Sequence, residues 1–317
     1  MRVLAREGNL ILGKALATLG TLIGAKGTLA ENRWRAAEDA IGVRLTLSGK
    51  VQVVYTIPAA ATSPDEWTLW AQTGDDFAPR GKAKSFGLPG FAPGTVAYTT
   101  QLLRTKFGPV GKSNDTLLLR TDGDSTDLLA DESGAVPGPD GTALPGLKFK
   151  KFLDPVAGVD GRIAFIGTIA GPGVGASNRT GIWFASADDG LKLIARAGGL
   201  APGGGLWASF DSLALPDGPG SAPVFTGKLK VEGSTGVTRS NRQGLWAVDS
   251  EGGLRLLLRA GQTYTVDGSA RVVKTFVALA PSPDSLGAAR GVDADGNVTA
   301  LVTFTDGRQA LLTMGVP

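Results

Sequence analysis

The 317-residue chain contains no cysteine and no histidine. Without cysteine it forms no disulfide bond and offers no thiolate for catalysis or metal binding. Without histidine it has no Ser-His-Asp or Cys-His nucleophilic site, no imidazole metal ligand and no side chain that ordinarily titrates near neutral pH. Any catalysis would therefore depend on carboxylates, lysine, tyrosine or activated hydroxyl groups.

The sequence also lacks a strong charge of either sign and a long apolar run. Its formal net charge is +3, and its basic residues are scattered. The densest basic groups are residues 33–35 and residues 148–151. The second alternates with Phe149 and Phe152 and resembles a strip on which nucleobases stack. Lysines on the solvent side of a β-strand explain the same pattern, so we expect no nucleic-acid partner. No run of about 18 apolar residues occurs, and we expect no membrane span.

Glycine is abundant, with 47 residues, and 18 prolines accompany it. These residues punctuate an internal repeat. The segment 193–203, LIARAGGLAPG, has altered copies at residues 3–13, 128–138 and 256–266. The copies at residues 128, 193 and 256 begin 65 and 63 residues apart, and the copy at residue 3 begins 190 residues before residue 193. Such spacing indicates a repeat architecture, in which each unit needs its neighbours to bury its apolar faces.

Each unit is predicted to contain four antiparallel strands, A to D. Strand A is rich in Trp, Ile and Leu, as buried strands are, and it follows a Ser-Asn pair. Strand B contains the repeated segment, strand C follows it, and a Gly turn leads into strand D. The clearest A strands are predicted at residues 117–119, 181–185 and 244–248. The D strands are predicted at residues 51–57, 95–101, 162–169, 223–229 and 298–305.

Units of four strands and about 64 residues predict an all-β, five-bladed β-propeller formed by a single domain, residues 1–317. The chain begins inside a strand B and finishes with a strand A at residues 309–314. We therefore expect the N- and C-terminal strands to share one blade and close the ring. The alternative is a fragment of an open array of β modules. The expected blades are residues 1–58 with 308–317, 63–112, 113–176, 177–239 and 240–307.

The connections from strand B to strand C and from strand D to strand A are long, and both leave the same end of a four-stranded sheet. Binding residues usually lie on such loops above a rigid scaffold, so we place a candidate ligand-binding site on this long-loop face. Its candidate residues are Asn114, Asn178, Arg179, Asn241 and Arg242. A structural role is the alternative for the asparagines, because Asn accepts positive φ and hydrogen-bonds its own backbone in turns.

A second recurring position lies in strand B. Arg6, Arg196 and Arg259 occupy it, and the third unit has Asp131 there. An ion pair between blades or a clamp on backbone carbonyls accounts for these arginines without a ligand.

Metal sites and catalytic sites find little support in the sequence. Asp122, Asp124 and Asp127 offer oxygen ligands for calcium, but they fall on a tight turn between strands A and B. We therefore expect no cofactor and no metal, and a weak calcium site at this turn is the alternative. The enzymatic alternative is a carboxylate-dependent glycoside hydrolase or lyase, since five-bladed propellers host glycoside hydrolases. That chemistry needs two carboxyl groups facing each other across a sugar, and no catalytic residue is assigned.

The pattern Asn178-Arg-Thr-Gly181-Ile-Trp183, followed by residues 193–203 and a Phe-bearing strand, resembles bacterial exported proteins with tandem NxxGxxAF repeats and varied surface anchors. The resemblance implies export, an extracellular or cell-surface location and a role other than catalysis. With the composition and the loops, it leads us to expect a monomeric binding or display module. The expected ligand is a glycan or a protein.

Overall fold

The computed structural model confirms the all-β prediction. It describes residues 5–19, 36–37, 40–92, 94–104, 110–122, 125–186, 189–216, 222–278, 292 and 296–316. The helical segments within these ranges are three short 3₁₀ turns: η2 (Ser48–Lys50), η3 (Pro64–Glu66) and η4 (Gly233–Thr235). In the same ranges, no helix has the length and apolar character needed to cross a membrane.

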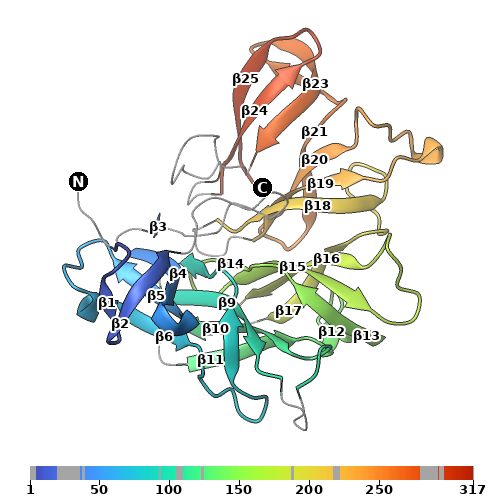
Figure 1. The fold of residues 1–317 in the computed structure, drawn as a ribbon. Helices are drawn as coiled ribbons and strands as arrows, with labels where there is room; N and C mark the ends of the chain where they lie inside the picture. The colour runs from blue at the N-terminus through green and yellow to red at the C-terminus, as the bar shows by residue number, and fades with distance from the viewer. Residues whose placement is uncertain are drawn as a thin grey trace.

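The described strands form five antiparallel sheets that follow one another along the chain in a curved series (Figure 1). The first sheet contains β1 (Leu10–Ile11), β2 (Lys14–Leu19), β3 (Ala36–Ala37), β4 (Ala40–Leu47), β5 (Val51–Pro58) and β6 (Thr68–Gln72). The second contains β7 (Ala83–Phe86), β8 (Gly90–Ala92), β9 (Thr95–Leu102), β10 (Thr116–Asp122) and β11 (Ser125–Asp131).

The remaining three sheets continue the series upward on the right of Figure 1. The third contains β12 (Ala135–Pro137), β13 (Ala143–Phe152), β14 (Val156–Ala157), β15 (Ile163–Ala170), β16 (Thr180–Ser186) and β17 (Gly190–Arg196). The fourth contains β18 (Trp207–Ala214), β19 (Val224–Leu229), β20 (Gln243–Val248) and β21 (Leu254–Arg259). The last contains β22 (Thr263–Val266), β23 (Ser269–Ala278), β24 (Val298–Phe304) and β25 (Gln309–Met314).

One register recurs across the sheets. The strands run in the order C, D, A, B, and in the fourth sheet Phe210, Gly227, Gly244 and Arg259 lie opposite one another on the four strands. We call this line of residues the cross-sheet row. In the other sheets it is Leu19–Leu45–Val53–Gln72, Phe86–Thr100–Leu117–Asp131, Phe152–Gly167–Gly181–Arg196 and, up to strand A, Phe276–Val302–Ala310.

This register corrects the expected blade limits. The limit at residues 176 and 177, for example, separates β15 from β16, which are paired neighbours. In the first sheet, β5 and β6 are strands A and B of the cross-sheet row, whereas residues 51–57 were expected as strand D. Residues 309–314 form β25, which pairs with β24, and among the described residues no N-terminal strand lies beside it. The D–A loops join paired neighbours, such as β15 and β16, instead of crossing between blades. A long loop is compatible with such a hairpin, because the entropy of loop closure grows slowly with length.

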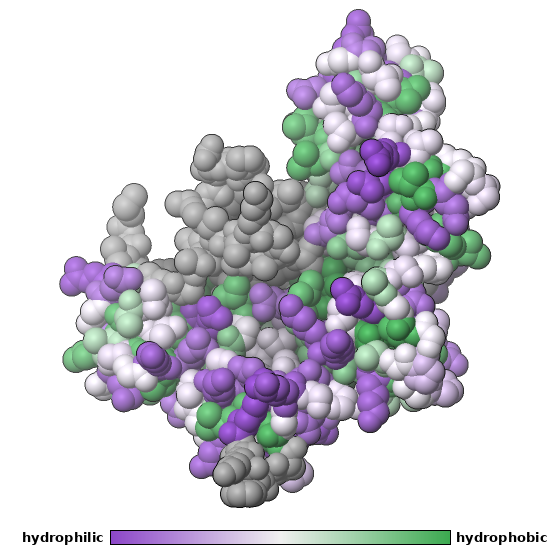
Figure 2. All heavy atoms as spheres, turned by 45° about the vertical axis from the view of Figure 1, so that its right-hand side comes forward, coloured by the Kyte–Doolittle hydropathy of each residue, from purple (hydrophilic) through white to green (hydrophobic). Residues whose placement is uncertain are grey.

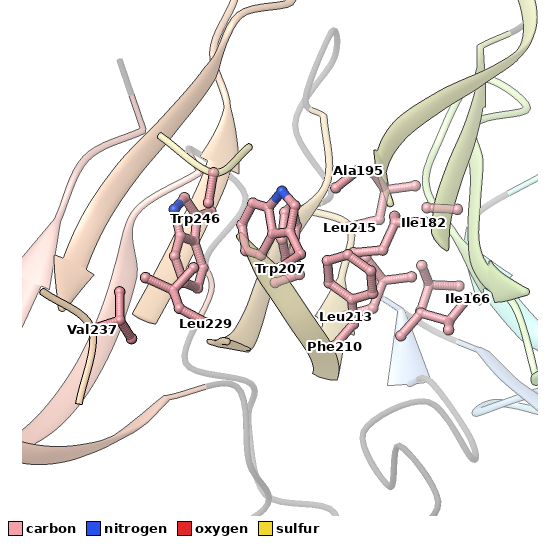
Figure 3. Packing of buried hydrophobic residues seen from close by; sticks show 14 residues of the cluster. Ile166, Ile182, Ala195, Trp207, Phe210, Leu213, Leu215, Leu229, Val237 and Trp246 are labelled. Carbon is pink, nitrogen blue, oxygen red and sulfur yellow. The ribbon is translucent and has the colours of Figure 1, made fainter. Parts of the chain in front are cut away.

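Consecutive sheets pack face to face through large apolar side chains. In Figure 3, Ile166 and Ile182 of the third sheet lie toward Trp207 and Phe210 of the fourth. Within the fourth sheet, the rings of Trp207 and Trp246 meet edge to face, with 4.3 Å between their centroids. Such aromatic contacts add to the stabilisation that comes from burying the side chains, and the cluster that contains both tryptophans also includes Ile166 and Ile182 of the third sheet.

The Gly-x-Trp sequence of strand A follows from this packing. The indole of Trp246 folds back over Gly244, and a Cβ on that glycine would lie 2.2 Å from Cη2 of the ring. Gly181 and Trp183 repeat the arrangement in the third sheet. The Trp246 indole N–H donates to the Pro202 carbonyl at 3.0 Å. Strand A is thereby tied to the loop that precedes strand C of its own sheet.

Candidate functional site

The turn that leads into strand C has the same geometry five times in the described residues. One residue adopts a left-handed backbone, and its N–H donates to a strand C carbonyl at 2.7–2.9 Å. At four turns this residue is Gly8, Gly74, Gly198 or Gly261, with φ between 80° and 99°. At the fifth turn it is Ser133, with φ of 70°.

Ser133 belongs to a three-residue departure from the two most similar copies of the repeat. Residues 131–133 read Asp-Glu-Ser, whereas residues 196–198 and 259–261 read Arg-Ala-Gly. A left-handed backbone is unfavourable for a residue with a Cβ. Strained residues of this kind cluster at functional sites. With the other copies as an internal reference, the B–C turn of the second sheet is the candidate site.

A pocket of about 250 Å³ opens beside this turn. Its walls come from the B–C turns that precede and follow the second sheet and from the D–A loop within it, so it opens among the long loops. Buried Val110 and Leu117 form its apolar part. The lining residues are Pro79, Arg80, Val110, Asn114, Leu117, Asp131, Glu132 and Ser133.

Two ion pairs fix the positions of charged side chains, one at the pocket and one beside it. The Arg80 guanidinium pairs with the Asp131 carboxylate. Beside the pocket, Arg104 pairs with Asp115, whose side chain is buried. The Asp115 N–H donates to Glu132 Oε2 at 3.3 Å. The arrangement combines guanidinium donors with carboxylate acceptors, and Glu132 adds a third carboxyl group to the two that face arginines.

The electrostatics set Glu132 apart. Burial raises the pKa of its carboxyl group above the ordinary value of 4.5, and the neighbouring charge of Asp115 raises the pKa further. The hydrogen bond from the Asp115 backbone opposes this shift but does not cancel it. The Ser133 hydroxyl donates to the Ser113 carbonyl at 2.7 Å, which fixes the left-handed turn beside Glu132.

The three predicted asparagines occupy one kind of turn before strand A. In each case the side-chain Oδ1 accepts a hydrogen bond from the N–H group three residues earlier. The donor and acceptor residues are Gly111 and Asn114 at 2.6 Å, Gly175 and Asn178 at 2.7 Å, and Thr238 and Asn241 at 2.7 Å. The amides of Asn178 and Asn241 also donate to carbonyls five residues earlier, at 2.9 and 3.1 Å. The structural interpretation of these asparagines therefore accounts for their recurrence.

Of the five candidate ligand residues, Asn114 lines the pocket and Asn178, Arg179, Asn241 and Arg242 do not. Arg179 is exposed and Arg242 is half-buried. The sequence reasoning missed Glu132 and Ser133. The signal that points to them is the loss of the recurring arginine and glycine within three residues.

Two of the recurring arginines, Arg196 and Arg259, are carbonyl clamps, as one interpretation of the sequence predicts. Arg196 Nε donates to the Asn178 carbonyl at 2.7 Å, and Arg259 Nε donates to the Asn241 carbonyl at 2.8 Å. Asp131 replaces the clamp in the second sheet and forms the ion pair at the pocket instead.

One of the three predicted calcium ligands, Asp127, forms an ion pair with an arginine. The Asp127 carboxylate pairs with Arg120 Nη2 at 2.8 Å. The Asp122 side chain and Asp124 lie outside the described residues. In the part of the chain that the structure describes, no group of three or more acidic side chains is placed to hold a metal ion.

Residues 50–316 match the model of DUF7453, a family of unknown function. The chain belongs to this family. Comparison with curated protein sequences gives no match.

Solved structures with which the chain aligns are distant. The cobalt-substituted apocarotenoid oxygenase of Synechocystis aligns with a TM-score of 0.38 and 11% identity, over 87% of this chain and 55% of that one. The Trypanosoma rangeli sialidase in complex with sialic acid aligns with a TM-score of 0.37 and 8% identity, over 99% and 58%. A family 117 glycoside hydrolase of Zobellia galactanivorans aligns with a TM-score of 0.30 and 13% identity, over 77% and 70%. The chain thus spans little more than half of the oxygenase and the sialidase.

Proposed function

We propose that this protein is a binding module whose site is the pocket at the B–C turn of the second sheet. One observation carries the proposal: the pocket adjoins the single turn, among five in the described residues, where Ser133 replaces glycine in the left-handed position. Proteins depart from locally favourable choices mainly where a site requires it. The four glycine turns give the geometry of a turn that serves the fold alone.

The lining favours a ligand rich in hydroxyl groups, and we propose a saccharide unit of a glycan. The guanidinium of Arg80 donates hydrogen bonds, and the carboxylates of Asp131 and Glu132 accept them. Val110 and Leu117 supply apolar surface for the C–H groups of a sugar ring. Ligand sites typically combine such surface with a few placed polar groups.

A glycan array followed by titration calorimetry with the strongest glycan tests this proposal. We expect Glu132→Gln to weaken binding at least tenfold, which corresponds to about 1.4 kcal/mol. Asn178→Ala is the control, because it alters the turn before strand A in the next sheet, away from the pocket. Absence of any glycan ligand would refute the ligand class. Equal losses in the two variants would refute the position of the site.

The raised pKa of Glu132 favours a second candidate, a carboxylate-dependent glycoside hydrolase or lyase. A carboxyl group that keeps its proton near the working pH suits a general acid. Its neighbour Asp115 is already paired with Arg104, and retaining hydrolysis needs a carboxyl partner about 5–5.5 Å away across the sugar. Release of reducing ends from the bound glycan, lost in Glu132→Gln, would establish the enzyme. Binding without cleavage would support the module.

We also propose that the five sheets are blades of one closed, five-bladed propeller. The shared cross-sheet row and the curved series of sheets support this arrangement. The resemblance to exported proteins with NxxGxxAF repeats supports a secreted or surface-displayed monomer. Fractionation of the native host, with the protein detected by antibody, tests the location, and recovery from the cytoplasm alone would contradict it.

A further inference from the structure

The last sheet lacks two contacts that the other four sheets have. β25 lies at its edge, with no strand B beside it in the described part of the chain. One face of the sheet exposes Val277, Leu301 and Leu311, which lie opposite one another on β23, β24 and β25. Their exposed fractions are 56%, 42% and 73%. Figure 2 shows apolar side chains reaching the surface of this sheet, at the top of the view.

The repeat shows what covers this face elsewhere. Leu311 follows Ala310 of the cross-sheet row, and the residue at that position is fully buried in each of the other four sheets. Those residues are Val54, Leu118, Ile182 and Leu245, all with 0% exposure. Each packs in a cluster with strand C residues of the following sheet, as Ile182 does with Trp207 (Figure 3). Leu311 has the position of a buried residue, but in the part of the chain that the structure describes no following sheet covers it.

The turn at Gly8, near the N-terminus, resembles the turns that follow strand B in the other sheets. The turn at Gly8 repeats the geometry of the B–C turns, with φ of 89° and its N–H donating to the Leu16 carbonyl at 2.8 Å. Each observed strand B ends two residues before the left-handed residue of such a turn. These end residues are Gln72, Asp131, Arg196 and Arg259. Arg6 stands two residues before Gly8 and thus has the position of the last residue of a strand B.

We propose that Ala5 and Arg6 pair with β25 in the position where a strand B ends and that this pairing draws the N-terminal sheet over Val277, Leu301 and Leu311. The cross-sheet row sets the register, with Arg6 opposite Ala310. The occupant is this same chain, because the turn at Gly8 leads into β2 as the turn at Gly198 leads into β18, the strand that covers Ile182. This pairing rests on the closed ring proposed above and is independent of ligand binding at the pocket.

The arginine clamp makes the register specific. Arg196 and Arg259 each donate Nε to the carbonyl of the residue three positions before their partner on strand A. The corresponding carbonyl in the last sheet is that of Gly307. Arg259 is only 8% exposed, whereas Arg6 is exposed in this arrangement of the chain. Closure buries the Arg6 side chain against Gly307.

The absence of cysteine makes disulfide trapping a clean test. In the inferred register Ala5 lies opposite Leu311, as Ala195 lies opposite Ile182. Directly opposed residues on antiparallel strands have the Cα separation that a disulfide needs, about 4.5–5.5 Å. We expect Ala5→Cys/Leu311→Cys to cross-link within the monomer on mild oxidation, as seen by non-reducing electrophoresis and peptide mass spectrometry. The matched control Ala5→Cys/Leu301→Cys lies one strand further away, about 10 Å, and should not cross-link.

A disulfide-linked dimer in place of the monomeric product would overturn the inference in favour of a second copy of the chain. So would the absence of any cross-link in a folded double variant. A second measurement avoids dependence on oxidation. If Leu311 is covered, Leu311→Asp should lower the midpoint of thermal unfolding by about 5 °C or more. A shift within about 1 °C, as expected for a residue that is 73% exposed, would also overturn it.

Discussion

Ser133 holds, at φ of 70°, the left-handed backbone that Gly198 holds at φ of 82° in the next copy of the same turn. Two effects act on Ser133 in opposite directions. Its Cβ makes the conformation unfavourable, while its hydroxyl donates to the Ser113 carbonyl. The turn beside the pocket is therefore stabilised by a side chain, where the other copies depend on the freedom of glycine.

Ser133→Ala should reduce the free energy of unfolding by about 1 kcal/mol, because it removes the hydrogen bond and keeps the backbone strain. Ser133→Gly should lie closer to the natural protein, since the relief of strain offsets the lost hydrogen bond. Urea denaturation of the two variants gives both values. If alanine is as well tolerated as glycine, the hydroxyl has no stabilising role at this turn.

Gly244→Ala should destabilise the protein by about 1–3 kcal/mol. The added methyl group would lie 2.2 Å from the Trp246 ring, and a packed interior yields poorly to such overlap. Gly175→Ala is the control, because a Cβ there meets nothing within 4 Å. Thermal and urea unfolding should separate the two variants. Equal stabilities would mean that the indole has room to move away from strand A.

Arg259→Met should cost more stability than Arg196→Met. Arg259 donates to the carbonyls of both Asn241 and Gly203, each at 2.8 Å, and is nearly buried. Its removal leaves two carbonyls without that donor, at about 1 kcal/mol for each lost hydrogen bond. Arg196 donates Nε to the Asn178 carbonyl, so a smaller loss of about 1 kcal/mol is expected. The reverse order in urea denaturation would show that the second contact, to Gly203, contributes little.

The repeated segment with Leu193 made the strands predictable, because apolar patterning and Gly turns are local properties of the sequence. The pairing of those strands was not. A loop as long as residues 171–179 is compatible both with a hairpin and with a crossing between sheets, since loop closure costs little more for a longer loop. The register decides between them, and it depends on bulges and cross-strand contacts that a single sequence does not display.

The candidate site was predictable in part. Asp131 is visible in the sequence as a departure from Arg196 and Arg259, and the long-loop face contains the pocket. The pocket itself is not visible, because Arg80 meets Asp131 across 51 residues of chain. The recurrence of Asn178 drew attention to a turn that every copy of the repeat needs for its own backbone. In a repeat protein, recurrence marks the scaffold, and departure from it marks the site.

With rising pH, the free energy of unfolding of the natural protein should decrease relative to that of the Glu132→Gln variant. The carboxyl pKa is raised in the folded state, first by burial and then by Asp115. The folded protein therefore binds more protons than the unfolded chain between the ordinary value of 4.5 and the folded pKa. Across that window Glu132 lowers the free energy of unfolding of the natural protein as pH rises, and the glutamine variant lacks this contribution.

Urea denaturation from about pH 4 to pH 7 measures both profiles. Asn178→Ala, which removes no titratable group, is the control and should follow the pH profile of the natural protein. Parallel profiles for Glu132→Gln and the natural protein would show that Glu132 titrates as an ordinary carboxyl group.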